Sequence, residues 1–88
     1  MDCTSLTSVT IPDSITSIWG GAFHGCTSLA SVAIPSSVTY IGPDTFYGCT
    51  SLTDVYYGGS EAQWEEITIE YDNDELLSAV IHYDSTEN

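Results

Sequence analysis

The chain has 88 residues, of which 42% are hydrophobic, thirteen are acidic and none is lysine or arginine, so its formal net charge is −13. This length allows one domain at most. Without a cationic side chain to neutralise phosphate, the chain is expected to bind neither nucleic acid nor an anionic membrane surface directly. It contains no apolar run long enough to span a bilayer and no signal peptide, so the sequence leaves the localisation open.

A motif of four residues, Cys-Thr-Ser-Leu, occurs three times at a constant offset of 23 residues, at positions 3–6, 26–29 and 49–52. The first two copies also align without a gap beyond the motif, which matches Ile11 with Ile34 and Phe23 with Phe46. A fixed period of this length is typical of repeat proteins whose successive coils stack on one another.

Each repeat predicts one coil made of two short extended segments and two turns. In the first coil, residues 6–11 alternate between inward and outward side chains, as in a half-buried strand. Pro12 has no N–H for a strand ladder and predicts a turn at 12–14. A second extended segment follows at 15–18, and the chain then turns before Phe23, which should fill the core. Equivalent residues of neighbouring coils should lie above one another, about 4.8 Å apart.

The last third of the chain predicts a cap that closes the stack. Residues 77–82 resemble residues 52–57 at an offset of 25, and the interval between them contains a helical pattern. Ser60 is the expected N-cap with Gln63 as its capping-box partner, and the helix should turn Trp64 and Ile67 toward the core. Terminal repeats differ from the others because they must shield the apolar end of the stack from water.

These elements together predict one domain over residues 1–88. It has repeats at 3–25 and 26–48, a third at 49–57 followed by the insertion, a degenerate capping repeat at 58–83 and a tail at 84–88. The predicted fold is a mainly β solenoid with 23-residue coils, short turns or helical segments at the corners, and a C-terminal cap containing a short helix and a final strand. The side chains expected in its core are Leu6, Val9, Ile11, Ile18, Phe23, Cys26, Leu29, Val32, Ile34, Ile41, Phe46, Cys49, Leu52, Val55, Trp64, Leu77 and Val80.

The repeat resembles the BspA-type leucine-rich repeat of bacterial surface proteins. The Cys-Thr-Ser-Leu start, the Ile-Pro pair at 11–12 and the Ala-Phe-x-Gly corner at 22–25 carry the resemblance, and the stretch from Val55 through Trp64 to Tyr83 is similar to the segment that closes such repeats. The resemblance implies a leucine-rich-repeat solenoid that contacts other proteins, often in adhesion at the bacterial surface or after secretion, without enzymatic activity. Trp19 departs from the family, which usually has glycine at that position.

The repeat pattern begins at the start of the given sequence and predicts no capping segment before the first coil. Its apolar side chains Leu6, Val9, Ile11, Ile15 and Phe23 and its strand edge are therefore expected to be exposed. Either the chain is a fragment of a longer repeat protein, which we favour, or another chain covers this face. Self-association through the N-terminal coil is expected for the isolated polypeptide.

The pattern of residues predicts no catalytic group, no cofactor and no metal site. Zinc sites bring cysteines about two to four residues apart, and parallel stacked side chains suit a disulfide poorly. The cysteines are therefore expected to be reduced and buried, with Cys3 the most exposed and reactive. His24 and His82 have no ligand spacing. The oxygen-rich loop at 72–75 has ligands that calcium prefers, but without EF-hand spacing it predicts a solvated turn instead.

Aromatic side chains on the outside of the coils are the candidate binding residues. They are Trp19, His24, Tyr40, Tyr47 and Tyr56. The repeat places His24 beside Tyr47 at the corner, and Trp19 near Tyr40 at the end of the second extended segment. Exposed Tyr and Trp are enriched at interaction hot spots, although the same rings could instead pack over the edge of the coil.

Two functions stand as hypotheses. The first is a non-enzymatic protein-binding module from a bacterial cell-surface or adhesin-like repeat protein. The alternative is a small acidic decoy that imitates nucleic acid and inhibits a basic nucleic-acid-binding protein. Ten of the thirteen acidic residues follow residue 53, which is unlike an evenly spaced row of phosphates. Binding by a decoy should weaken steeply with salt, whereas binding anchored by aromatic rings should not.

Overall fold

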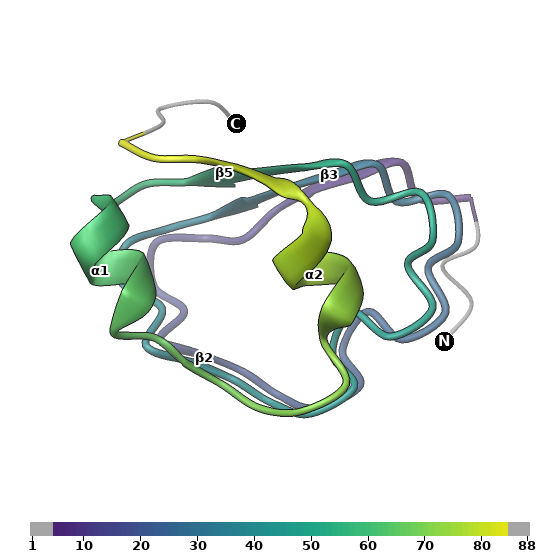
Figure 1. Cartoon of the computed structure of the whole chain (residues 1–88), viewed down its shortest axis with the longest axis horizontal. Coiled ribbons are helices and arrows are strands. Elements are labelled where there is room, and N and C mark those ends of the chain that lie inside the picture. Colours follow the sequence, from purple (N-terminus) through teal and green to yellow (C-terminus); the bar gives the residue numbers. More distant parts are fainter. Residues whose placement is uncertain (1–4, 85–88) are drawn as a thin grey trace.

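The computed structural model describes residues 5–84, in which two parallel sheets hold successive coils together (Figure 1). The first sheet has the order β1 (Ser8–Thr10), β3 (Ser31–Ile34), β5 (Asp54–Tyr57) and β7 (Val80–His82). The second sheet has the order β2 (Ser17–Ile18), β4 (Tyr40–Ile41) and β6 (Thr68–Ile69). In Figure 1 the first sheet lies at the top, the second at the bottom and the C-terminal coil in front.

The offset of 23 residues is confirmed in both sheets. Val9 pairs with Val32 and Val32 with Val55 in the first sheet, while Ser17 pairs with Tyr40 in the second. Because side chains alternate between the two faces of a strand, a repeat in register sends equivalent side chains to the same face. Apolar residues therefore form continuous columns inside the stack.

The last coil contains an insertion that forms a helix. Thr68 of β6 pairs with Tyr40, 28 residues earlier, which is five more than the repeat, and α1 (Glu61–Glu65) takes up the difference. The predicted capping box is present: the Gln63 N–H donates to Ser60 Oγ at 3.2 Å, and the Ser60 N–H donates to Gln63 Oε1 at 2.9 Å. The helix buries Trp64, whose ring meets Tyr57 edge to face at 5.2 Å.

The register of β7 differs by one residue from the alignment expected from sequence. Ile81 pairs with Val55 and His82 with Tyr56, an offset of 26 instead of 25. A slip of one residue moves every side chain of a strand to the other face. Val80, expected in the core, is accordingly 60% exposed. Leu77, which precedes this strand and was also expected in the core, is 56% exposed. The physical reason is α2 (Asp74–Ser78), which packs one face on the core and buries Leu76 there instead.

The burial of the other predicted core residues depends on the coil to which they belong. Those of the later coils are buried, namely Cys26, Leu29, Val32, Ile34, Ile41, Phe46, Cys49, Leu52, Val55 and Trp64. In the first coil Leu6, Val9, Ile15 and Phe23 are half-buried against the core. Ile18 is buried there. Ile11 is buried too, so the expectation that it is exposed is wrong, because its segment is held to the second coil by a hydrogen bond from its N–H to the Ala33 carbonyl at 3.0 Å.

The cysteines also differ from expectation. Cys26 is disulfide-bonded, so the prediction of reduced thiols throughout is wrong. Side chains at equivalent positions of stacked coils come within disulfide reach because coils are about one strand spacing apart. Cys49 is free and buried; burial raises the pKa of its thiol, which donates to the Phe23 carbonyl at 3.2 Å and is a poor nucleophile. Cys3, and all but the first residue of the predicted tail, lie outside the described residues.

Candidate protein-binding surface

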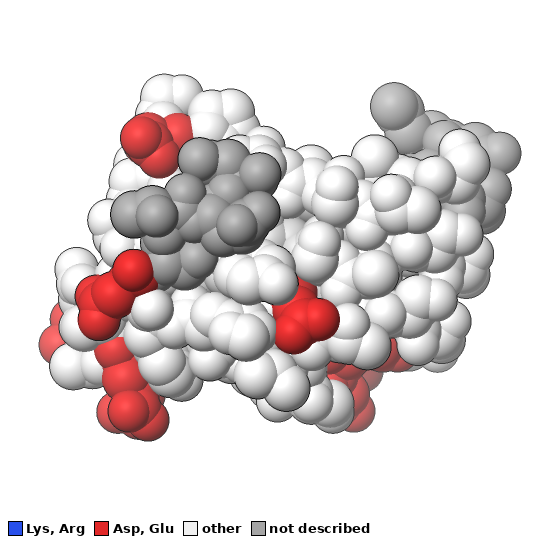
Figure 2. Space-filling view, turned by 90° about the horizontal axis from the view of Figure 1, so that it is seen from above, with Lys and Arg blue, Asp and Glu red and all other residues white. Residues whose placement is uncertain are grey.

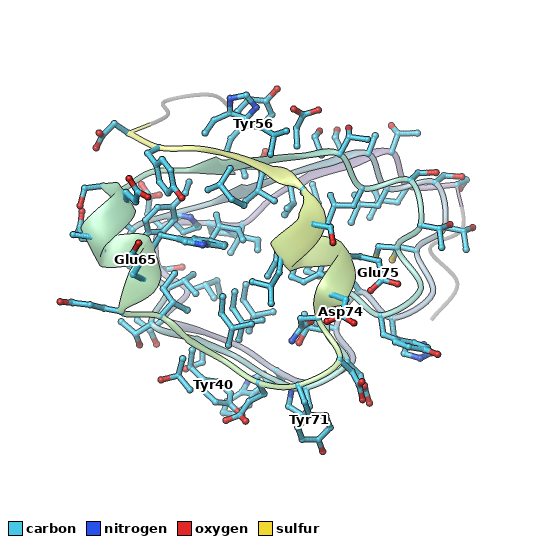
Figure 3. All side chains as sticks on the ribbon, in the orientation of Figure 1. Tyr40, Tyr56, Glu65, Tyr71, Asp74 and Glu75 are labelled. Carbon is cyan, nitrogen blue, oxygen red and sulfur yellow. The ribbon has the colours of Figure 1, made fainter. Side chains whose placement is uncertain are left out.

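The five predicted binding residues occupy three different sides of the coil. Tyr56 projects from the outer face of the first sheet, and Tyr40 projects from the second sheet on the opposite side (Figure 3). His24 and Tyr47 belong to the corner that follows the second sheet in each coil. The structure therefore brings four of these residues together as two separate pairs, Trp19 with Tyr40 and His24 with Tyr47, and leaves Tyr56 on a third side.

The corner pair stacks as the repeat predicts. The rings of His24 and Tyr47 lie 5.3 Å apart with an angle of 24° between their planes, and both side chains are exposed. Backbone hydrogen bonds hold the two coils in register here, since the Gly25 N–H donates to the Tyr47 carbonyl at 2.8 Å. The pair is a preformed aromatic surface whose position follows from the period alone.

On the first sheet, Tyr56 stacks on His82, with 4.7 Å between ring centroids. His82 Nε2 lies 3.0 Å from Asp54 Oδ1, and this hydrogen bond lowers the pKa of the Asp54 carboxyl below its usual value. His82 was not among the predicted site residues. The expected offset of 25 aligned it with Tyr57, whereas the observed register pairs it with Tyr56.

On the second sheet, the rings of Trp19 and Tyr40 meet edge to face at 6.4 Å. Trp19 nevertheless remains 73% exposed. Tyr71, which follows β6 and is 68% exposed, projects on the same side as Tyr40 in Figure 3. Sequence reasoning missed Tyr71 because the insertion before β6 breaks the repeat alignment in this coil.

Two aspartates stack next to these rings. Asp44 and Asp72 both adopt the left-handed backbone conformation, with φ of 60° and 62°, and the Asp44 N–H donates to the Tyr71 carbonyl at 3.1 Å. The hydrogen bond with the Asp44 carboxyl raises the pKa of Asp72, and burial and repulsion from Asp44, Asp74 and Glu75 add to the effect. Two neighbouring carboxyl groups can share a hydrogen bond only when one of them is protonated.

The loop at 72–75 does not assemble the oxygen ligands considered for calcium. Asn73 is buried and its amide bonds to backbone groups of the core. Within residues 5–84, no group of three or more His, Cys, Asp or Glu side chains is arranged to hold a metal ion.

A pocket of about 150 Å³ between α1 and the second coil is lined by Ser36, Val38, Thr39, Tyr57, Gln63, Glu66 and Ile67.

We expect Asp72→Asn to raise the midpoint of thermal unfolding at neutral pH. Because the pKa of Asp72 is raised in the folded state, its charged form opposes folding above that pKa, and stability returns as the pH falls through it. Asparagine tolerates the left-handed conformation equally well. The gain should be present at neutral pH and disappear below about pH 3, where carboxyl groups are protonated.

Circular dichroism melts of both proteins across this pH range measure the effect. Asp84→Asn is the matched control, because Asp84 is also exposed and left-handed, with φ of 53°. An equal gain in the control, or a lower midpoint for Asp72→Asn at neutral pH, would contradict the assigned repulsion.

The chain is similar to a known protein family and to a protein of known structure. The sequence matches the family model described as BspA type Leucine rich repeat region (6 copies) over residues 1–78. A leucine rich cell surface protein from Faecalibacterium prausnitzii A2-165, known from a crystal structure, is 49% identical and superposes with a TM-score of 0.71. The match covers 75% of this chain and 17% of that one. No curated protein matches the chain. Among residues 5–84, neither helix has the length and apolar character needed to cross a bilayer.

Proposed function

Because the chain belongs to the BspA-type leucine-rich-repeat family, we propose that it is a non-enzymatic protein-interaction module of a larger cell-surface or secreted repeat protein. The observation that carries the proposal is the presence of aromatic pairs on three outer sides of the stack. Rings left on the surface add contact area for a partner, and Tyr and Trp are enriched at interaction hot spots.

The repeat stack also prepares these rings for binding. The ring of each pair in one coil is positioned against a ring of the next coil by the parallel ladder between them. A partner that binds rings already held in place loses less conformational entropy than one that must order them. The stacked coils thus supply preformed contact surfaces on several sides.

An adhesin-like role at the bacterial surface is the finer form of this proposal. It is supported by the similarity to a protein that is itself described as a leucine rich cell surface protein. The acidic-decoy alternative has no comparable support. Figure 2 shows the carboxylates in separate groups on the visible face, whereas imitation of a nucleic acid backbone requires a continuous row of charges.

A solid-phase binding assay of the 88-residue chain on host extracellular-matrix and epithelial surface proteins tests the proposal. Three double variants remove one pair each: Trp19→Ala with Tyr40→Ala, His24→Ala with Tyr47→Ala, and Tyr56→Ala with His82→Ala. We expect at least one of them to lower the affinity for a bound protein about tenfold or more, as hot-spot residues do.

Glu61→Gln with Glu65→Gln on α1 is the control, since both carboxylates are exposed and neither residue belongs to an aromatic pair. Circular dichroism of every variant separates loss of binding from loss of fold. The proposal fails if none of the host proteins binds, or if the folded variants all bind as the unmodified chain does. A steep loss of affinity with salt, unaffected by any aromatic variant, would instead favour the decoy.

A further inference from the structure

The outer side of the second sheet combines exposed rings with carboxylates. We call it the aromatic–acidic surface, and it consists of Trp19, Tyr40, Asp44, Glu70, Tyr71 and Asp72. Equivalent ladder bonds define its register: the Gly42 N–H donates to the Ile18 carbonyl at 2.8 Å, and the Glu70 N–H donates to the Ile41 carbonyl at 2.9 Å. Trp19, Gly42 and Glu70 therefore occupy equivalent positions in three successive coils.

The glycine between Trp19 and Glu70 matters for the shape of this surface. Gly42 carries no side chain, and a Cβ there would lie 3.1 Å from the Trp19 carbonyl carbon. The Trp19 ring turns toward Tyr40 of the second coil. An aromatic ring of the first coil and a carboxylate of the third are thus separated by one coil that has no side chain at this position.

The rings of this surface are exposed to an extent that the fold does not require. Trp19 and Tyr71 are 73% and 68% exposed, although covering an aromatic ring is favourable. Both are absent from the core cluster and from the partly buried residues packed against it. A partner that covers them gains apolar contact without any rearrangement of the core.

Among residues 5–84, no side chain supplies a cation to the carboxylates of this surface. The chain contains no lysine or arginine, His82 is paired with Asp54 on the first sheet, and His24 stacks on Tyr47 at the corner. The hydrogen bond between the carboxyl groups of Asp44 and Asp72 raises the pKa of Asp72, and the repulsion between the two groups adds to this effect. A positive charge placed beside them would relieve this repulsion.

We propose that the aromatic–acidic surface binds an extended basic segment of a partner protein. Arginine side chains of that segment lie over the rings of Trp19 and Tyr71 and pair with the carboxylates of Asp44, Asp72 and Glu70. A guanidinium group satisfies both parts of the surface at once, because it stacks on aromatic faces and forms bidentate pairs with carboxylates. The inference rests on the proposed protein-binding function and assigns the chemistry of the partner.

Calorimetric titration of the full chain with a short peptide of alternating arginine and glycine tests the proposal. The matched probe replaces each arginine by citrulline, which has the same shape without the charge. We expect the arginine peptide to bind and the citrulline peptide to bind about tenfold more weakly or not at all. Trp19→Ala, and separately Asp44→Asn with Asp72→Asn, should each lower the affinity for the arginine peptide about tenfold.

Two control variants distinguish this surface from general attraction to an acidic protein. Leu77→Ala removes an exposed apolar side chain from α2, and Glu61→Gln with Glu65→Gln removes two exposed charges from α1. Both should leave the affinity for the arginine peptide almost unchanged. The proposal is overturned if the arginine peptide does not bind, if Trp19→Ala binds it normally, or if the α1 variant weakens it as much as the Asp44 and Asp72 variant does.

The outcome is independent of the test of the proposed function. A host protein whose binding depends on His24 and Tyr47, or on Tyr56 and His82, but not on Trp19, would uphold the interaction module and overturn this assignment. A host protein whose binding is lost with Trp19→Ala and is blocked by the arginine peptide would support both.

Discussion

Replacing Asn73 by leucine should lower the free energy of unfolding by about 3 kcal/mol, since two or three buried backbone groups lose their hydrogen-bond partner. Asn73 is only 1% exposed. Its Oδ1 accepts from the Phe46 N–H at 2.9 Å, and its Nδ2 donates to the carbonyls of Gly42 at 2.9 Å and Glu70 at 3.0 Å. Leucine is close in size but can make none of these bonds.

Asn73 matters because it ends the ladder of hydrogen bonds between successive coils. Without its side chain, backbone groups of the last complete coil would lack partners. In the preceding coils the Phe23 N–H donates to the Thr45 carbonyl at 3.0 Å, so each corner is satisfied by the backbone of the next coil. Phe46 has the Asn73 side chain in place of that carbonyl. The Gly48 N–H likewise donates to Glu75 Oε2 at 3.3 Å. Side chains of the cap thus replace backbone acceptors of a further coil.

Urea denaturation and thermal melts measure this effect, and the midpoint of thermal unfolding should fall by about 12–24 °C for a chain of this size. Asp74→Asn is the control, because Asp74 is the exposed neighbour of Asn73 at the start of the same helix, and it should change stability by less than about 0.5 kcal/mol. A loss below about 1 kcal/mol for Asn73→Leu would show that the ladder does not depend on this side chain.

Gly42→Ala should also cost about 3 kcal/mol, for a steric reason. A Cβ at this position would overlap the Gly20 nitrogen and lie 2.8 Å from the Gly20 Cα. These are backbone atoms of the first coil, so no rotamer change can relieve the overlap and the two coils must move apart. The same movement would separate the Trp19 ring from Tyr40, which now meet at 6.4 Å.

Gly58→Ala is the matched control for this substitution. Its Cβ would lie 3.4 Å from the nearest atom, the Ser36 nitrogen, which is an ordinary contact. We expect this variant to lie within about 1 kcal/mol of the unmodified chain, because alanine also reduces the entropy of the unfolded state. Equal stability of the two alanine variants in urea would contradict the close approach of the coils at Gly42.

The sequence by itself determined the features that depend on local pattern and on the period. The alternation of apolar residues placed Val32 and Val55 in one buried column, and the offset of 23 residues alone predicted that His24 stacks on Tyr47. The capping box of Ser60 and Gln63 is equally local, because its two hydrogen bonds join residues three positions apart. In each case the interacting residues are related by a spacing that can be counted along the chain.

Only the tertiary structure decided what lies beyond the end of the regular repeat. The insertion at α1 and the helix α2 break the period. The register of β7 therefore depends on which face of α2 contacts the core. This register pairs His82 with Tyr56 and brings it to Asp54. Asn73 looks in sequence like a residue of a solvated turn. It is buried because the last complete coil presents hydrogen-bonding groups that must be satisfied, and this requirement arises only once the coils are stacked.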